Sequence, residues 1–175
     1  MKIFVGCGSS EDINKDYFDG CELLLNRLLK KNDLVYGAYN NGIMNIAYKC
    51  AKKNGNKIIG VAPRVYESDL NELDINEKIL VDNILQRTYK LIKMSDAIIF
   101  LPGGIGTINE MFASIDMKRS GEIDKPIIIF NYNHYYDYLI DFLNKLFKEK
   151  FSEESIKNCY KVASSIYEVL DYFDC

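Results

Sequence analysis

The sequence contains few of the residues that bind metals or form disulfides. It has one histidine, His134, and no two cysteines at the close spacing of a zinc or redox motif. Its five cysteines, odd in number and far apart, are Cys7, Cys21, Cys50, Cys159 and Cys175. We therefore expect free, mostly buried thiols in a reducing cytosol, and neither a metal site nor a redox cofactor.

Long apolar runs and an excess of basic charge are also missing. No segment approaches 18 apolar residues, and the apolar start of the chain, residues 1–5, is too short for the core of a signal peptide. The net charge is −3, and charged residues are scattered along the chain, so no basic face indicates nucleic-acid binding. These features predict a cytoplasmic protein that binds neither membranes nor nucleic acids.

No linker, internal repeat or low-complexity segment interrupts the 175 residues, which predicts a single domain over residues 1–175. Runs typical of strands occur at 2–6, 34–36, 57–62, 78–81, 97–101, 125–130 and 160–162. Helical spacing of apolar residues occurs at 18–29, 43–53, 84–92, 108–118, 135–147 and 165–173. This alternation predicts an α/β protein with a three-layer, Rossmann-like fold, in which helices flank a mainly parallel sheet. The polar segment 67–77 is expected to be a loop.

A glycine-rich stretch, Leu101 to Glu110, joins an expected strand to an expected helix. Gly103, Gly104 and Gly106 let the backbone turn tightly and bring its N–H groups against a ligand. The positive end of the following helix points to the same place, where anions and above all phosphates bind well. The stretch therefore predicts a phosphate site.

Three known motifs can be compared with the glycine-bearing turns of this chain, and only the first of them fits. Thr107 and Glu110 match a capping box, with Thr107 as the N-cap residue and Glu110 accepting from the N-cap N–H. A P-loop is excluded because no lysine stands between Gly106 and Thr107. A dinucleotide fingerprint is disfavoured because the opening Gly6-x-Gly8 lacks its third glycine.

Two more glycine-bearing turns follow expected strands. Gly8 and Ser9 come after the first strand, and Gly42 ends a turn after the second. Open α/β sheets bind ligands at the carboxyl ends of their strands, so these residues are candidates for the same ligand site. An ordinary strand-to-helix turn accounts for them as well.

The helix expected at 84–92 carries one basic residue of interest. Its apolar residues, including Ile84 and Leu85, are spaced to face the core. Arg87 lies two to three residues off the centre of that face. Periodicity alone therefore describes Arg87 as a solvated cation.

The stretch Pro102-Gly-Gly-Ile-Gly-Thr-Ile-Asn-Glu110 matches the PGGxGTxxE motif of the LOG ("Lonely Guy") family, which is often mislabelled as lysine decarboxylases. Arg87 lies nine residues before Asp96, the spacing at which that family places its helix arginine. Gly6-Cys-Gly-Ser-Ser10 resembles the family's opening CGSS loop, and Gly42-Ile-Met44 resembles part of its second loop. The resemblance covers nearly the whole chain.

LOG proteins are phosphoribohydrolases that cleave cytokinin riboside 5′-monophosphates, and often AMP, to a free base and ribose 5-phosphate. The resemblance implies that Arg87 and Glu110 are the catalytic pair. It also implies a site for the 5′-phosphate formed by Gly103, Gly104, Gly106 and Thr107. It further implies a homodimer with helices near Arg87 at the shared site.

The chain departs from the family pattern in two places. The usual helix motif Met-His-Glu-Arg-Lys is Ile84-Leu-Gln-Arg-Thr88 here, so Leu85, Gln86 and Thr88 replace a histidine, a glutamate and a lysine. The usual second loop GGG-S-V-G-L-M-G is Gly37-Ala-Tyr-Asn-Asn-Gly-Ile-Met-Asn45, in which Tyr39 adds bulk. Both departures bear on which base the protein accepts.

The implied chemistry suits these residue types. Cleavage of an N-glycosidic bond builds positive charge on the ribose carbon, which a carboxylate such as Glu110 can stabilise while it orients or deprotonates water. Arg87 can hold the phosphate or the ribose hydroxyls and favour the ionised form of Glu110. Two alternatives are a non-catalytic nucleotide or cofactor carrier and a nucleoside deoxyribosyltransferase.

Overall fold

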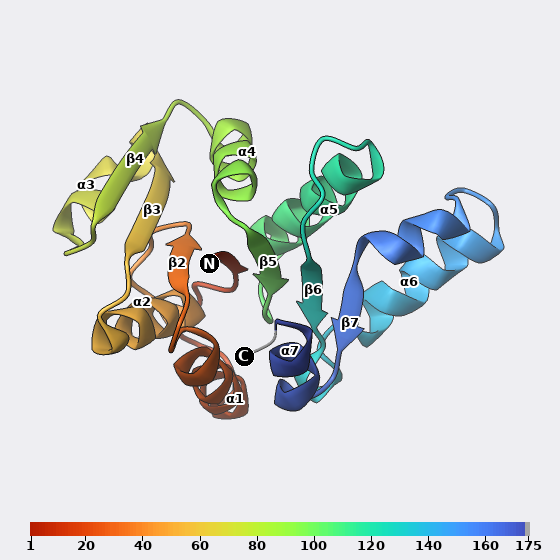
Figure 1. Cartoon of the computed structure of the whole chain (residues 1–175), viewed down its shortest axis with the longest axis horizontal. Helices are drawn as coiled ribbons and strands as arrows, with labels where there is room; N and C mark the ends of the chain where they lie inside the picture. Colours follow the sequence, from red (N-terminus) through yellow and green to blue (C-terminus); the bar gives the residue numbers. More distant parts are fainter. Residues whose placement is uncertain (174–175) are drawn as a thin grey trace.

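A seven-stranded sheet forms the centre of the structure, a computed structural model that describes residues 1–173 (Figure 1). The strands are β1 (Lys2–Gly6), β2 (Asp33–Tyr36), β3 (Ile58–Pro63), β4 (Glu77–Val81), β5 (Ala97–Phe100), β6 (Ile127–Phe130) and β7 (Lys161–Ala163). Their order is β4-β3-β2-β1-β5-β6-β7, and all neighbours are parallel. The predicted α/β fold with a parallel central sheet is confirmed.

Helices cover both faces of this sheet. They are α1 (Lys15–Leu28), α2 (Gly42–Asn54), α3 (Glu67–Glu72), α4 (Ile84–Met94), α5 (Ile105–Arg119), α6 (Asp137–Lys148) and α7 (Ile166–Tyr172), with short 3₁₀ helices η1 (Arg64–Tyr66), η2 (Tyr132–His134) and η3 (Glu154–Cys159). One core cluster joins the sheet to α1, α2, α3 and α7, and the other joins it to α4, α5 and α6. The three layers of the predicted fold are therefore present.

The two clusters follow from side-chain alternation in the strands. In β1, Ile3 and Val5 belong to the first cluster, whereas Phe4, which lies between them, belongs to the second. Phe100 of β5 contacts Phe4 edge to face, with ring centroids 5.8 Å apart. Strands that are apolar on both faces must be covered on both sides, as parallel sheets are.

The strand order reverses between β1 and β5. From β1 the chain runs outward through β2 and β3 to β4, and it then returns through α4 to β5 on the other side of β1. The helices that follow β1 and β5, α1 and α5, cover opposite faces of the sheet, which leaves a crevice beyond the carboxyl ends of the strands at this point. The sequence therefore places its glycine-bearing turns around the crevice where open α/β sheets bind ligands.

The segment 67–77 is a loop only at residues 73–76, so the loop prediction was wrong for the rest of it. Its first part is α3, and its last residue begins β4. Glu67 and Asp69 lie in the first turn of α3, where negative charge suits the helix dipole, and Leu70 and Leu73 are buried. One buried leucine within a six-residue helix, with Leu73 at its C-cap, gives too little periodicity for a sequence pattern to reveal.

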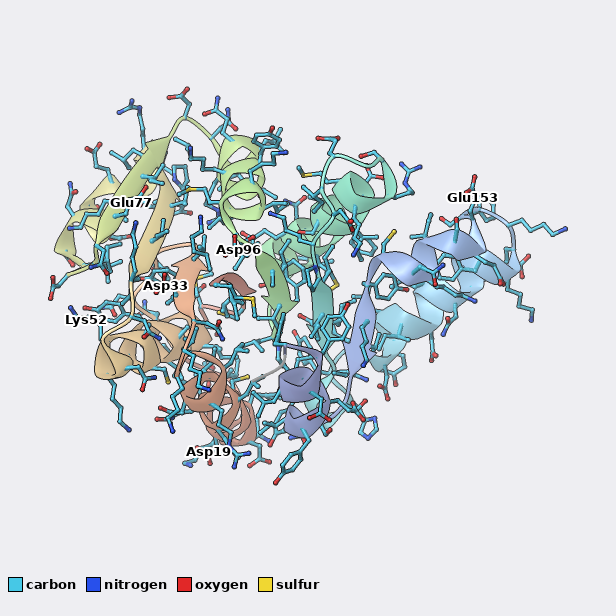
Figure 2. All side chains as sticks on the ribbon, viewed as in Figure 1. Asp19, Asp33, Lys52, Glu77, Asp96 and Glu153 are labelled. Carbon is cyan, nitrogen blue, oxygen red and sulfur yellow. The ribbon has the colours of Figure 1, made fainter. Side chains whose placement is uncertain are left out.

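Cys7, Cys21 and Cys50 are buried and free, and Cys159 is free and partly buried, whereas Cys175 lies outside the described residues. Charged side chains such as Asp19, Lys52 and Glu77 are spread over different elements (Figure 2). Some lysines pair with nearby acids, as Lys52 does with Asp74 at 2.7 Å. Within residues 1–173, no helix is both long and apolar enough to cross a bilayer.

Candidate functional site

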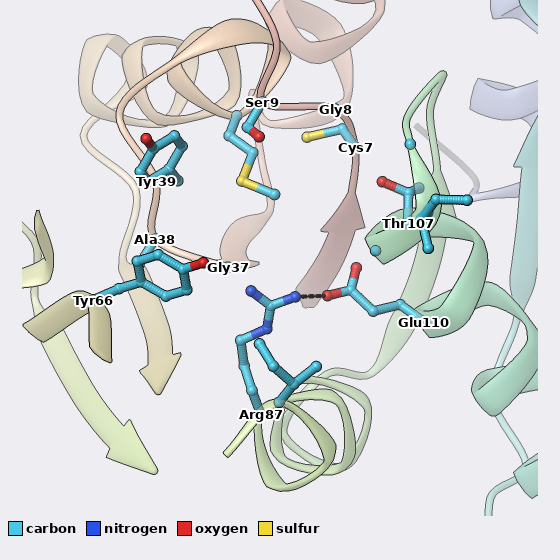
Figure 3. Close-up of a pocket in the computed structure, with 15 residues that line it drawn as sticks. Cys7, Gly8, Ser9, Gly37, Ala38, Tyr39, Tyr66, Arg87, Thr107 and Glu110 are labelled. Atoms are coloured by element: carbon cyan, nitrogen blue, oxygen red, sulfur yellow. Dashed lines mark hydrogen bonds and ion pairs between the residues drawn. The ribbon is translucent and has the colours of Figure 1, made fainter. Parts of the chain in front are cut away.

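A cavity of about 460 Å³ opens at the carboxyl ends of the central strands (Figure 3). Its wall is formed by the loops after β1, β2 and β5, by η1 and by the first turns of α4 and α5. The predicted site residues that line it are Gly8, Ser9, Arg87, Gly104, Gly106, Thr107 and Glu110. Gly42 and Gly103 are not on the wall but pack directly behind it, as described below.

An ion pair joins two helices inside this cavity. Arg87 Nη2 on α4 donates to Glu110 Oε1 on α5 at 2.6 Å, and the two side chains point toward one another (Figure 3). The Glu110 side chain is 2% exposed and that of Arg87 is 13% exposed. The solvated-cation description of Arg87 is therefore wrong, because the helix turns this side chain toward the cavity and not toward solvent.

The start of α4 fixes the direction of Arg87. Asn83 is the N-cap residue, and its side chain accepts a hydrogen bond from the Gln86 N–H at 3.0 Å. The Gln86 side chain in turn accepts from the Asp82 N–H at 3.0 Å. These local hydrogen bonds fix where the helix begins, and so they fix the direction in which each side chain of the first turn points. Leu85 faces outward and is 75% exposed, in contrast to its expected place on the apolar face.

Burial dominates the electrostatics of the pair. Burial raises the pKa of Glu110 above its usual value of 4.5, and the charge and hydrogen bond of Arg87 offset this only in part. Arg87 Nε is buried and has no hydrogen-bond partner among the described residues. An unpaired buried donor costs free energy, so leaving this N–H without a partner offsets part of what the ion pair contributes.

Backbone hydrogen bonds connect the three glycine-bearing loops around the cavity. The Gly8 N–H donates to the Pro102 carbonyl at 3.0 Å, and the Gly8 carbonyl accepts from the Ile43 N–H at 3.0 Å. Gly42 has a φ of +59°, and a Cβ there would lie 2.6 Å from the backbone of Ser9. Gly42 therefore lets α2 begin close against the loop after β1.

Helix α5 begins three residues before its predicted start, at Ile105, with Gly104 as its N-cap residue and no side-chain cap. Thr107 lies inside the first turn, so the predicted capping box, which made Thr107 the N-cap, is wrong. The first N–H groups of α5 have no partner within a helix, and they lie at the cavity wall. Backbone donors and the positive end of the helix dipole therefore meet at this point of the cavity.

The glycines of this loop differ in what surrounds them. A Cβ on Gly103 would lie 2.2 Å from Thr107 Oγ1 and 2.8 Å from the Gly8 nitrogen, so a side chain is excluded by packing. A Cβ on Gly104 or Gly106 would meet nothing within 4 Å. Protein packing does not require glycine at these two positions, and their bare backbone faces the cavity.

The family model described as "Possible lysine decarboxylase" matches residues 44–173. A probable cytokinin riboside 5′-monophosphate phosphoribohydrolase of Oryza sativa is 33% identical over 172 residues, which cover 97% of this chain and 69% of the relative. The chain belongs to the LOG family. A cytokinin riboside 5′-monophosphate phosphoribohydrolase of Arabidopsis thaliana is 35% identical over 152 residues, 86% of this chain and 71% of the relative.

Solved structures share the fold of this LOG chain at low sequence identity. The molybdenum cofactor binding protein of Rippkaea orientalis superposes with a TM-score of 0.72 at 20% identity, covering 99% of this chain and 94% of that one. The molybdenum cofactor carrier protein of Chlamydomonas reinhardtii gives 0.71 at 17% identity, covering 99% and 95%. At such identities the likeness concerns the fold alone.

The replaced residues of the LOG helix motif, Leu85, Gln86 and Thr88, do not line the cavity. Leu85 is on the outside of α4, and Thr88 is buried with its Oγ1 unpaired among the described residues. Arg87, the motif residue that this chain keeps, is the one that reaches Glu110. The departures from the LOG motif therefore leave the ion pair intact.

Sequence reasoning missed several residues of the cavity wall, which are Cys7, Gly37, Ala38, Met44, Tyr66, Ile84 and Ile105. Tyr66 follows β3, so its place at a strand's carboxyl end was a usable signal. Burial raises the pKa of the Cys7 thiol well above its usual value, so Cys7 presents a neutral thiol and not a nucleophilic thiolate.

Proposed function

We propose that this LOG protein hydrolyses the N-glycosidic bond of a nucleoside 5′-monophosphate and releases the free base and ribose 5-phosphate. The observation that carries the proposal is the buried ion pair of Arg87 and Glu110 beside the glycine loop, in one cavity. The names of the relatives support the reaction class. AMP and cytokinin riboside monophosphates are the proposed substrates.

The 5′-phosphate binds at the N-terminus of α5. The N–H groups of the loop residues Gly104 and Gly106 donate to it, and the helix dipole favours its negative charge. Gly103 and Gly42 hold the loops in place behind it, and Gly8, Ser9 and Thr107 complete the wall. The sugar then extends toward Arg87 and Glu110.

Glu110 acts at the anomeric carbon. The bond between that carbon and the base nitrogen breaks, and its electron pair leaves with the base, so the sugar gains oxocarbenium character. The Glu110 carboxylate stabilises this charge and takes a proton from the attacking water, whose oxygen bonds to the carbon. The proton then passes to the departing base. Arg87 donates to the ribose hydroxyls or the phosphate through the guanidinium N–H groups that do not donate to Glu110.

Purified protein incubated with a panel of nucleoside monophosphates tests the proposal. We expect equal amounts of free base and ribose 5-phosphate, at the same rate with or without an added acceptor base. Transfer of the sugar to the acceptor would indicate a transferase instead. Tight binding of every nucleotide without turnover would indicate a carrier and would overturn the proposal.

We propose in addition that the protein is a homodimer joined through the α4 and α5 side of the cavity. Ile84 at the start of α4 and Ile105 at the start of α5 are exposed apolar side chains that line the cavity, and Leu85 and Tyr89 of α4 are exposed as well. Exposed apolar groups that gather in one place are typical of interfaces. A molar mass of one chain, measured by light scattering at assay concentration, would contradict this proposal.

Two alanine substitutions in the glycine loop should have opposite effects. Gly106→Ala is expected to raise the free energy of unfolding by about 0.5–1 kcal/mol, because alanine suits a helix better than glycine. It should weaken the binding of ribose 5-phosphate, because its methyl group enters the space where the phosphate is proposed to lie. Gly103→Ala should lower stability by about 1–3 kcal/mol through overlap with Thr107.

Denaturant unfolding and titration with ribose 5-phosphate measure both quantities for each variant. Wild-type affinity in Gly106→Ala would show that the phosphate does not bind at this loop. Gly55→Ala is not a suitable control, because Gly55 has a φ of +72°, which strains any side chain.

A further inference from the structure

Two tyrosines form the wall of the cavity that lies opposite Thr107 and Glu110 (Figure 3). Tyr39 belongs to the loop after β2, and Tyr66 is the last residue of η1, which follows β3. Their rings meet edge to face, with centroids 6.4 Å apart and planes at 64°. Together they present an aromatic corner to the cavity, which we call the tyrosine wall.

The backbone beside this wall is in an unusual conformation. Ala38, which precedes Tyr39, has a φ of +55° although it is not a glycine. The left-handed region disfavours a residue with a Cβ, and such residues persist where the surrounding structure holds them, often next to ligand sites. Ala38 is buried, so the strained turn is packed in place and sets the position from which the Tyr39 side chain projects.

The position of the tyrosine wall matches the length of a mononucleotide. Tyr66 follows β3, and the glycine loop follows β5, which is three strands further along the sheet order β3-β2-β1-β5. With neighbouring strands about 4.8 Å apart, this separates the two ends of the site by about 14 Å. Arg87 lies between them, and the Glu110 carboxylate that it contacts lies on the side of the glycine loop (Figure 3). A nucleotide with its phosphate at the glycine loop and its sugar at Glu110 therefore directs its base toward the tyrosine wall.

We propose that Tyr39 and Tyr66 bind the base of the substrate and make the site selective for purine over pyrimidine nucleotides, an inference that rests on the proposed function. Aromatic side chains hold bases by stacking on their faces. A corner made of two rings offers a face and an edge at once, and the two fused rings of a purine cover more of it than one pyrimidine ring does. The selectivity then depends on aromatic area and not on hydrogen bonds to base edges.

Binding to a variant without turnover tests this inference apart from catalysis. In the Glu110→Gln background, the affinities for AMP, UMP and ribose 5-phosphate are measured by calorimetry. We expect AMP to bind about 10-fold more tightly than UMP, and Tyr39→Ala or Tyr66→Ala to weaken AMP binding about 10-fold or more. Ribose 5-phosphate has no base, so its affinity should stay unchanged.

Matched variants separate the ring from the hydroxyl and from the fold. Tyr39→Phe keeps the ring and should bind AMP as the parent does, and Tyr138→Ala, at an exposed position on α6, should change nothing. If an alanine variant does not fold, Tyr39→Leu and Tyr66→Leu fill the space without an aromatic face and should show the same loss. Equal AMP affinity in the parent and in both leucine or alanine variants, or equal affinity for UMP and AMP in the parent, would overturn the inference.

The same measurements keep the two proposals distinct. If the native protein releases no base but AMP binding depends on the tyrosines as expected, the hydrolase proposal fails and the base site stands. If the native protein hydrolyses AMP while the tyrosine variants bind it normally, the base site fails and the hydrolase proposal stands.

Discussion

Glu110→Gln is expected to lower the rate of adenine release from AMP by about 10²–10⁴-fold, the usual contribution of a general acid–base residue. Glutamine has nearly the shape of glutamate and can still accept the hydrogen bond that Arg87 Nη2 donates at 2.6 Å. It carries no negative charge and cannot take a proton from water. Burial already disfavours the charge of Glu110, and Arg87 is the more exposed partner at 13%, so the free energy of unfolding at neutral pH should stay within about 1–2 kcal/mol of the native value.

The pH dependence of stability provides a second measurement for this variant. Burial raises the folded-state pKa of Glu110 above 4.5, so the folded state holds the proton more tightly than the unfolded state does. The resulting stabilisation is complete below pH 4.5 and is lost as the pH rises through the folded-state pKa. Glu110→Gln should lack this decrease, and activity of the native protein should fall as the pH drops through the same range.

Glu149→Gln is the matched control, because Glu149 is exposed at the end of α6. It should leave both the rate and the pH dependence of stability unchanged. Full activity of the Glu110→Gln variant would exclude Glu110 as the acting group, even if Arg87 and the glycine loop still bind the nucleotide.

The fold could be predicted from the sequence because its strands are short apolar runs, several of which end in glycine-bearing turns. β5 and β6, Ala97–Phe100 and Ile127–Phe130, are buried at every position, and no other element suits such runs between helices. The glycine motif indicated the phosphate loop for a physical reason, since two of its glycines, Gly104 and Gly106, have no packing role. At this loop, the glycine motif of the sequence therefore agrees with the space that a bound phosphate would need.

The direction of Arg87 could not be predicted from periodicity. An amphipathic pattern assigns the core face correctly for Leu91, which is buried, but near the start of α4 it treats Ile84 and Leu85 as core residues. The sheet ends below this first turn, so the turn faces a cavity and solvent and not a packed layer. The tyrosine wall was missed for a related reason, because the contact of Tyr39 with Tyr66 depends on the parallel pairing of β2 with β3.

Arg87→Met is expected to be the most destabilising of the proposed substitutions and to abolish activity. Removing one partner of a buried ion pair typically costs about 3–5 kcal/mol, because the other charge stays buried without compensation. Glu110 can reduce this cost by taking up a proton, so its pKa should rise further than in the native protein. The loss of stability should therefore be largest at neutral pH and smaller at acidic pH, which denaturant unfolding across a pH series measures.

The double variant Arg87→Met with Glu110→Gln separates pairing from packing. It contains no buried charge at this position, so most of the stability lost in Arg87→Met should return while activity stays absent. Arg119→Met is the matched control, because Arg119 pairs with Asp116 at an exposed position of α5 and should change stability by less than about 1 kcal/mol. A double variant as unstable as Arg87→Met, with the same loss at every pH, would mean that the arginine stabilises the fold by filling space and not by compensating the charge of Glu110.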